Sequence, residues 1–286
     1  RKYGRDHFGG HKTEIISCLN SFHGRTLFTV SVGGQPKYSK DYAPLPQGIT
    51  HVPFNDIAAL EAAISENTCA VIIEPIQGES GILPATQEYL QAARRLCDEH
   101  GALLILDEVQ TGMGHTGKLF AYEHYGITPD ILSSAKALGG GFPIGAILTT
   151  DKIAPTFGPG THGSTFGGNP MACAVGSRAF DIINAPETLA HVEKQGQKFQ
   201  TTLRELGEKT GVFKEVRGMG LLIGCVLADQ YKGRASEITA AALKHGLMVL
   251  VAGADVVRFA PSLLLNDEDM AEGLKRLEAA LTEWIA

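Results

Sequence analysis

The first half of the chain alternates short apolar runs with helix-like patterns. Residues 102–106 are apolar at every position, over the length of a typical strand. Residues 86–100 space Leu90, Ala93 and Leu96 so that they fall on one face of a helix. Because strands without alternation are buried on both faces, the pattern predicts an α/β fold with a mostly parallel sheet sandwiched by helices. Further strands are expected at residues 14–19, 69–73, 131–132 and 144–148.

The pattern changes after Gly168. Small apolar residues are followed by a long helix with one polar face, two strands on either side of Gly218, and a charged terminal helix from Asp267. These features predict a smaller α+β domain at residues 185–286, after a larger domain at residues 1–184. The chain begins at Arg1 without a methionine, so we expect the larger domain to be incomplete at its N-terminus. The elements expected in the second half are residues 170–183, 187–211, 212–217, 221–227 and 236–245, with short strands near Val249 and Val257.

Composition narrows the classes of function. The net charge of −6 argues against nucleic-acid binding, which needs a basic face, so an anionic substrate would need locally placed arginines. The five cysteines are widely spaced and include no C-x-x-C pair, which favours buried thiols in a reducing cytoplasm over a metal or redox site. No apolar run reaches the length of a transmembrane helix, so no membrane partner is expected.

Lys136 is the only charged residue between Asp130 and Asp151, in a segment of small and apolar residues. A lysine buried there would lose the hydration of its ammonium group, which favours the neutral amine and suits a lysine that forms a Schiff base. The alternative is a lysine that reaches solvent from a helix.

Asp107 ends the apolar run at residues 102–106, and ligands of open α/β sheets bind beyond the carboxyl ends of the strands. A carboxylate there can hold a proton on a pyridine nitrogen, although an aspartate at this point could equally cap a helix. Glu79 follows another expected strand, in Glu-Pro-Ile-Gln-Gly-Glu (74–79), where it could also be an ordinary solvated acid.

Three further groups could bind anions. The glycine-rich loop at residues 162–170 precedes a helix of small residues, and hydroxyls and backbone N–H groups at a helix start suit a phosphate. Arg25 lies in Phe-His-Gly-Arg (22–25). Arg258 lies between apolar residues of an expected strand, where it would bind a substrate carboxylate or form an internal salt bridge.

Five ordered motifs together resemble the class III pyridoxal-phosphate-dependent aminotransferases. They are Phe-His-Gly-Arg-Thr (22–26), Glu-Pro-Ile-Gln-Gly-Glu (74–79), Leu-Asp-Glu-Val-Gln-Thr-Gly (106–112), Ala-Lys-Ala-Leu-Gly-Gly-Gly (135–141) and Gly-Ser-Thr-Phe-Gly-Gly-Asn-Pro (163–170). The resemblance covers essentially the whole chain and is closest to members that act on N-acylated ornithines. It implies the type I aminotransferase fold in a cytoplasmic homodimer whose active sites lie at the subunit interface.

The resemblance also implies cofactor-binding residues. Lys136 would carry pyridoxal 5'-phosphate as a Schiff base and move the proton during transamination, and Asp107 would pair with the pyridinium nitrogen. Phe22 would stack on the ring, and Thr165 would reach the phosphate of the neighbouring subunit's cofactor. The remaining cofactor-binding residues are Glu108, Val109 and Gln110, with Gln110 near the ring hydroxyl. No metal is expected.

For the substrate, the resemblance implies that Arg25 and Arg258 bind carboxylates and that Ser164 lies near the substrate. Glu79 would help to select which acid is accepted. The expected reaction moves the terminal amino group of an acylated ornithine, acetylornithine first, to 2-oxoglutarate, giving glutamate and an acylated semialdehyde in arginine metabolism.

The alternative amino donors are succinylornithine, succinyl-diaminopimelate, ornithine and 4-aminobutyrate, because the motifs are common to enzymes for all of them. An inactive binding or scaffold homologue is the alternative outside enzymes. Three features depart from the family pattern. The family's upstream phosphate-binding segment, Ser-Gly-Thr/Ala-Glu-Ala-Asn, is absent from this sequence, His115 stands where arginine is usual, and Ser80 stands where glycine is usual.

Overall fold

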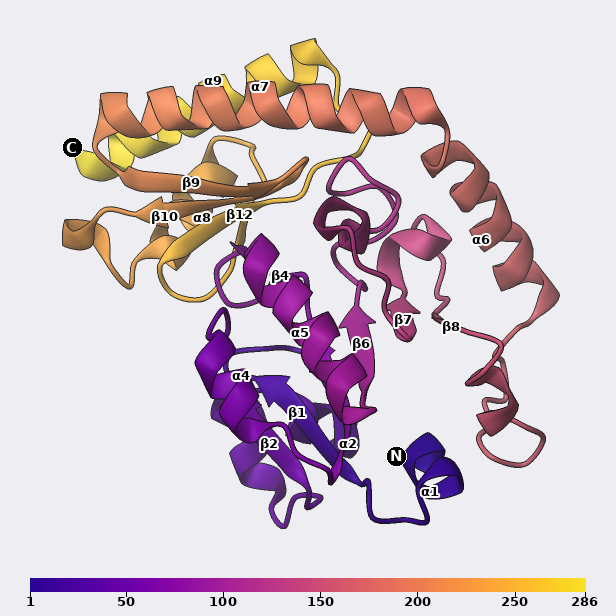
Figure 1. The fold of residues 1–286 in the computed structure, drawn as a ribbon. Coiled ribbons are helices and arrows are strands. Elements are labelled where there is room, and N and C mark those ends of the chain that lie inside the picture. Colours follow the sequence, from indigo (N-terminus) through magenta and orange to yellow (C-terminus); the bar gives the residue numbers. More distant parts are fainter. The chain divides into compact units, whose positions relative to one another are not determined.

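The computed structural model describes all residues from Arg1 to Ala286, and they divide into two compact units. Unit 1 comprises Arg1–Pro75, Ala85–Gly112 and Phe120–Asp181. Unit 2 comprises Ile76–Pro84, Met113–Leu119 and Ile182–Ala286. Figure 1 shows the elements of both units. None of the helices combines the length and the apolar character needed to cross a bilayer.

Unit 1 is built on a six-stranded sheet. Five neighbouring strands are parallel, and the edge strand β8 is antiparallel to β7. The predicted α/β fold with a mostly parallel sheet is therefore confirmed. The order across the sheet is β2 (Ile49–Val52), β1 (Glu14–Cys18), β3 (Thr68–Ile73), β6 (Leu103–Asp107), β7 (Ile131–Ser134) and β8 (Ala146–Thr149).

Helix α5 (Gln87–His100) shows how local sequence defines an element of unit 1. The Thr86 hydroxyl caps its start by accepting from the Tyr89 N–H, and Gly101 ends it in the left-handed conformation at φ 60°. Its buried face contains Leu90, Ala93 and Leu96, as predicted. The other helices that begin in unit 1 are α1 (Lys2–His7), α2 (Leu27–Val32), α3 (Pro36–Ser39), α4 (Ile57–Ala63) and α6 (Pro170–Ile183).

Unit 2 contains a four-stranded antiparallel sheet covered by two long helices. Helices α7 (Pro186–Thr210) and α9 (Asp267–Ile285) lie side by side over it (Figure 1). Phe199 of α7, Leu277 of α9 and Val257 of the sheet belong to one buried cluster. The sheet order is β11 (Leu250–Val251), β12 (Val256–Phe259), β10 (Leu222–Leu227) and β9 (Phe213–Met219), and α8 (Ala235–Lys244) also belongs to this unit.

The short hairpin of β4 (Ile76–Gln77) and β5 (Leu83–Pro84) groups with unit 2, although it lies at residues predicted for the first domain. The physical reason is burial, because Ile76 and Ile82 pack into a cluster with Leu222 and Val256 of the unit 2 sheet. The main segment of unit 2 begins at Ile182, three residues before the predicted boundary. The division into domains at residues 1–184 and 185–286 stays a prediction.

A buried lysine links two elements of unit 1. Lys12 is 5% exposed, and its amine donates to the carbonyls of His100 at 2.7 Å and Thr68 at 3.3 Å. The His100 carbonyl lies at the end of α5, where the helix dipole also favours a cation. Lys12 therefore fastens the C-terminus of α5 to the start of β3.

We expect Lys12→Met to lower the free energy of unfolding by about 1–3 kcal/mol, because it leaves two carbonyls without their donor. Denaturant unfolding measures this change. Lys2→Met is the matched control, since exposed Lys2 pairs only with Asp6 one helical turn away and should contribute about 0.5 kcal/mol or less. Equal effects of the two substitutions would contradict the assignment.

Candidate active site

The residues of unit 1 that can do chemistry follow the carboxyl ends of its parallel strands. Phe22 comes after β1, Glu74 directly after β3, Asp107 ends β6, and Lys136 comes after β7. These four strands are parallel, so their carboxyl ends meet at one edge of the sheet. This edge is where open α/β sheets bind their ligands.

The Asp107 carboxylate is held from three directions. One oxygen, Oδ2, lies 2.8 Å from Nδ1 of His23. The other accepts from the Val109 N–H at 3.1 Å and the Ser133 hydroxyl at 3.0 Å. No helix begins here, so the helix-cap interpretation of Asp107 is wrong.

These contacts determine the charge of Asp107. Burial acts to raise the pKa of its carboxyl, but the hydrogen bond and electrostatic attraction of His23, together with Val109 and Ser133, outweigh it. The pKa of Asp107 therefore lies below its ordinary value, and the group is an anion at neutral pH. Its side chain is largely buried, at 10% exposure.

His23 is a site residue that the sequence prediction missed. Its side chain is 1% exposed, and its second ring nitrogen, Nε2, is buried without a hydrogen-bond partner. Because the Asp107 carboxylate can only accept, Nδ1 of His23 is the donor of the hydrogen bond between them. The signal was present in the Phe-His-Gly-Arg motif, but only the fold brings residue 23 to residue 107.

Lys136 is exposed, so the interpretation of a lysine buried among apolar groups is wrong for this chain, and the alternative of a lysine that reaches solvent is present, from a 3-10 turn in place of a helix. The reason is its place beyond the sheet edge, since the burial of β7 ends at Ser134. Lys136 opens a 3-10 turn, Lys136–Gly139, with φ of 46°. A positive φ is unusual for a residue with a side chain, and such strained positions gather at functional sites.

Phe22 and Arg25 lie in an aromatic cluster with Tyr38. The Phe22 N–H donates to Glu74 Oε2 at 2.9 Å, and its ring meets Tyr38 edge to face at 5.7 Å. The Arg25 guanidinium lies 4.4 Å from the Tyr38 ring centroid and 5.4 Å from that of Phe22. Arg25 is exposed, so this stacking leaves the edge of its guanidinium open to a carboxylate. The sequence analysis did not predict that Glu74 would bind the Phe22 N–H or that Tyr38 would stack with Arg25.

The Glu108 side chain is buried and forms hydrogen bonds only with other residues of unit 1. Its carboxylate accepts from the Thr111 hydroxyl at 2.6 Å and from the N–H groups of Ala121 and Tyr122 at 2.8 Å. Burial raises the pKa of Glu108 to about 7, because it outweighs the three hydrogen bonds that act to lower it. Contact of Glu108 with a cofactor would therefore be through its backbone. Val109 and Gln110, which follow it, are half-buried.

This raised pKa predicts a pH-dependent stability. The folded state holds the Glu108 proton up to about pH 7, whereas the unfolded state releases it near 4.5, so stability falls as pH rises through that interval. We expect wild type to lose about 3 kcal/mol relative to Glu108→Gln between pH 4.5 and pH 8. Denaturant unfolding of both proteins at several pH values measures the difference. A constant difference would show that Glu108 titrates normally.

Ser164 and Thr165 lie on an exposed loop before α6. The Ser164 hydroxyl accepts from the Gly167 N–H at 3.1 Å, and Asn169 caps the helix by accepting from the Ala172 N–H at 2.9 Å. Within the chain, no hydrogen bond connects Ser164 or Thr165 to Asp107 or Lys136.

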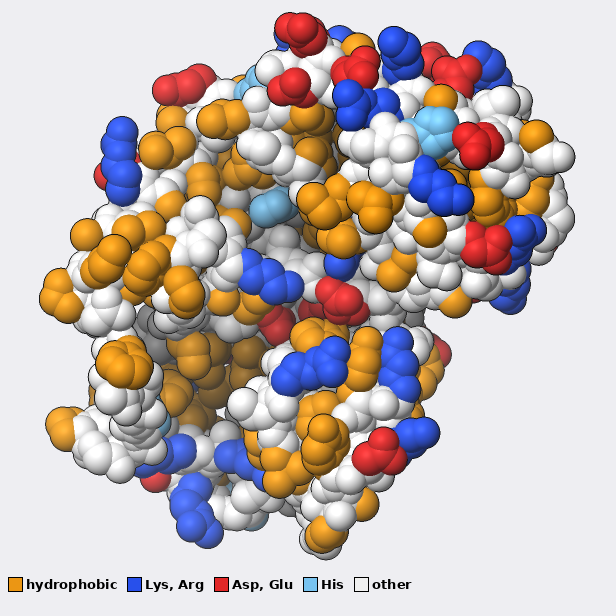
Figure 2. Space-filling view, turned by 180° about the vertical axis from the view of Figure 1, so that it is seen from behind, with side chains coloured by type: hydrophobic (Ala, Val, Ile, Leu, Met, Phe, Trp, Pro, Cys, Tyr) orange, Lys and Arg blue, Asp and Glu red, His pale blue; other side chains and the backbone are white.

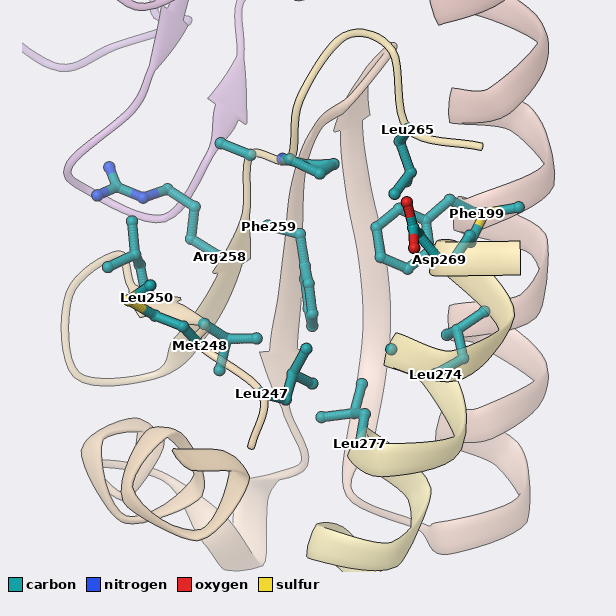
Figure 3. Close-up of a pocket in the computed structure, with 15 residues that line it drawn as sticks. Phe199, Leu247, Met248, Leu250, Arg258, Phe259, Leu265, Asp269, Leu274 and Leu277 are labelled. Atoms are coloured by element: carbon teal, nitrogen blue, oxygen red, sulfur yellow. The ribbon is translucent and has the colours of Figure 1, made fainter. Parts of the chain in front are cut away.

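In unit 2, Arg258 of β12 and Glu79 of the hairpin loop form an ion pair at 2.9 Å. Both side chains are largely buried, at 13% and 29% exposure. The internal salt bridge considered for Arg258 is therefore present, and the interpretation of Glu79 as a solvated acid is wrong. Figure 3 shows the Arg258 guanidinium turned away from Phe259 and Leu277. No three His, Cys, Asp or Glu side chains are placed to hold a metal ion.

Comparison with known proteins is consistent along the whole chain. Residues 1–281 match the family model described as aminotransferase class-III. Over all 286 residues, the chain is 83% identical to an acetylornithine aminotransferase from Neisseria meningitidis serogroup B, of which it covers 72%.

Solved structures give the same result. All of the chain aligns with 70% of an N-acetylornithine aminotransferase from Stenotrophomonas maltophilia, with a TM-score of 0.86 and 42% identity. Also, 99% of the chain aligns with 68% of an ornithine aminotransferase from Toxoplasma gondii, with a TM-score of 0.92 and 32% identity. That structure is described as revealing partial occupancy of PLP at its active site.

Proposed function

This chain belongs to the class III aminotransferase family, and from that membership we propose that it transfers the terminal amino group of an N-acylated ornithine to 2-oxoglutarate. It is a pyridoxal-phosphate-dependent transaminase, and the predicted family, fold and cofactor are confirmed. Acetylornithine is the proposed amino donor, because the relative at 83% identity carries that name. The products are then glutamate and the acylated semialdehyde.

One observation carries the proposed chemistry of unit 1. Asp107 is held as an anion at the sheet edge, and it ends the strand that neighbours the one leading to Lys136. An acceptor-only carboxylate fits the protonated ring nitrogen of the cofactor, and an exposed lysine fits its aldehyde. When bound, pyridoxal phosphate supplies an aldehyde that takes up amino groups and a ring that withdraws electrons from the substrate carbon.

The chain's own residues would then act as follows. Lys136 would hold the cofactor aldehyde covalently at rest. Once the donor amine takes its place, the freed lysine amine would move a proton from the amine-bearing carbon of the donor, across the nitrogen, to the former aldehyde carbon. Asp107 keeps the ring nitrogen protonated, and His23 keeps Asp107 oriented and ionised. Phe22 flanks the ring, and Arg25, held against Tyr38, binds a substrate carboxylate.

The Glu79–Arg258 pair is proposed to select the substrate. While Glu79 neutralises Arg258, a substrate carboxylate must displace Glu79 to bind the guanidinium. A dicarboxylic acid such as 2-oxoglutarate brings a second carboxylate that can do so. A donor whose side chain ends in an amine does not bring one, so Glu79 stays in place.

A panel of amino donors with 2-oxoglutarate tests the proposed reaction. We expect kcat/KM to be highest for acetylornithine, followed by succinylornithine, and lower for succinyl-diaminopimelate, ornithine and 4-aminobutyrate. A preference for unacylated ornithine would overturn the choice of substrate and leave the family unchanged. The presence of both Lys136 and Asp107 argues against an inactive binding homologue.

We also propose that the protein is a cytoplasmic homodimer with shared active sites. Unit 1 exposes large hydrophobic side chains on β8 and around the Ser164 loop, namely Ile147, Leu148, Phe157, Phe166 and Met171. On the molecular face drawn in Figure 2, hydrophobic side chains lie at the surface among charged ones. A second copy is the proposed cover, because it would bring Thr165 to its partner's cofactor phosphate and Ser164 near its partner's substrate. All five cysteines are free thiols, which suits a reducing compartment.

Subunit complementation tests the shared site. Lys136→Ala and Thr165→Val homodimers should each be impaired, whereas their mixed dimer should regain activity in one of its two sites. That site combines Lys136 of one subunit with Thr165 of the other, both wild type. Turnover after denaturing and refolding the two variants together measures the gain. A mixture no more active than its components would place Thr165 in its own subunit's site.

A further inference from the structure

The loop that carries Glu79 has a strained backbone. It joins β4 to β5, and its last two residues, Gly81 and Ile82, have positive φ angles of 114° and 50°. The second value is an outlier for a β-branched residue, and such a conformation persists only where its surroundings impose it. Part of the constraint is burial, because Ile82 is fully buried in the cluster with Leu222 and Val256.

The backbone of the loop is also held by three residues that lie side by side on neighbouring strands of the unit 2 sheet. Arg217 of β9 pairs in register with Gly224 of β10, which pairs in turn with Arg258 of β12. Glycine leaves a gap between the two arginines, and the loop fills it. A Cβ at residue 224 would lie 2.9 Å from the Ile82 Cβ and 3.2 Å from the Gly81 carbonyl oxygen.

The two arginines hold the loop from opposite sides of this gap. Arg217 Nε donates to the Gly81 carbonyl at 3.0 Å, while Arg258 pairs with the Glu79 carboxylate at 2.9 Å. A side chain at residue 81 would lie 2.7 Å from the Arg217 guanidinium, so the contact also requires glycine there. Arg217 is 23% exposed, and its only carboxylate partner is Glu215 at 3.4 Å.

We propose that Arg217 is a positioning residue for substrate selection. By holding the Gly81 carbonyl in the gap over Gly224, it keeps Glu79 within reach of Arg258. It thereby sets how readily a substrate carboxylate takes the place of Glu79. This inference rests on the proposed role of Arg258 as a binder of a substrate carboxylate. All of the contacts lie within unit 2.

The test compares Arg217→Met with Arg217→Lys in the full-length holoenzyme. The control is Arg204→Met, because Arg204 also donates to a backbone carbonyl of β9, that of Val216, but lies away from the loop. Hydrogen exchange of residues 78–82 reports on the loop without turnover. We expect faster exchange in Arg217→Met, partial protection in Arg217→Lys, which can still donate to Gly81, and wild-type exchange in Arg204→Met.

Kinetics provide the second measurement. The ratio of KM for acetylornithine to KM for 2-oxoglutarate should change by at least about threefold in Arg217→Met, the scale of one lost hydrogen bond. It should change in the same direction as in Glu79→Gln and stay constant in Arg204→Met. In the Glu79→Gln background, Arg217→Met should change the ratio no further, because the residue through which it acts is already neutral.

The measurements distinguish failure of the role of Arg217 from failure of the proposed role of Glu79. A changed ratio in Glu79→Gln with a constant ratio and constant exchange in Arg217→Met would overturn this inference and leave the proposed selection by Glu79 in place. An equal change in both backgrounds would show that Arg217 acts independently of Glu79, and would also overturn it. A constant ratio in Glu79→Gln would refute selection by Glu79 itself, and the inference with it.

Discussion

Replacement of Lys136 by alanine is expected to lower kcat by about 10⁴-fold, the upper end of what one positioned acid–base group contributes. The effect should be that large because the proposed role of Lys136 has two parts, covalent attachment of the cofactor and movement of the proton. Its exposed amine and its left-handed backbone at the end of β7 are the structural basis of that role. Stopped-flow measurement of single turnovers separates the chemical step from cofactor loss.

The control for this substitution is Lys152→Ala, an exposed lysine of unit 1 that has no proposed role. Borohydride reduction followed by peptide mass analysis should fix the cofactor on Lys136 in wild type and in Lys152→Ala, and label no lysine in Lys136→Ala. Normal turnover by Lys136→Ala, or cofactor fixed on a different lysine, would refute the assignment.

The fold of unit 1 was predictable where its strands are apolar. Residues 102–106 gave the position of β6 within about one residue, since a strand buried on both faces needs no partner to be recognised. Strand β2 was harder, because Thr50 is exposed and the burial of the strand alternates at a sheet edge. The assignment of the β4–β5 hairpin to unit 2 depends on the packing of Ile82 against Leu222, a contact across more than one hundred residues.

A site residue could be predicted only where its type and its neighbours in the sequence were enough to suggest a function. Asp107 at a strand end and Arg258 among apolar residues could be selected in this way. The hydrogen bond between His23 and Asp107 joins residues 84 positions apart, so no local pattern encodes it. The sequence could not decide whether Lys136 is buried or exposed, because its apolar neighbours belong to a turn at the sheet edge and do not cover it.

Pairing explains why some charges of this chain are structural and others are available to ligands. Asp130 precedes β7, at the opposite edge of the sheet from Asp107, and one of its oxygens accepts from Arg94 and from the Leu104 N–H, both at 2.8 Å. Its charge is thus compensated within the protein. The Asp107 carboxylate accepts instead from a histidine ring, a hydroxyl and an N–H group, and no arginine or lysine forms an ion pair with it.

Substitution of Asp107 by asparagine is therefore expected to lower kcat by about 10²–10³-fold, the usual effect of removing one preorganised electrostatic group. The lowered pKa of Asp107 means that its ionised form stabilises the fold above the ordinary value near 3.8, and that this stabilisation disappears as pH falls through the folded value. Asp107→Asn should thus lose some stability at pH 7 but not in strong acid. Turnover and unfolding measured across pH test both parts.

The matched control is Asp130→Asn, which should lose stability through its contacts with Arg94 and Leu104 while kcat stays near wild type. His23→Asn should lie between the two, because it leaves Asp107 in place but removes the donor that orients it. A shift in the pH dependence of the bound cofactor's visible absorbance in His23→Asn would mark an effect that reaches the ring nitrogen. If Asp107→Asn and Asp130→Asn lowered kcat equally, Asp107 would be a structural residue. The protonated ring nitrogen of the cofactor would then have to bind a different residue.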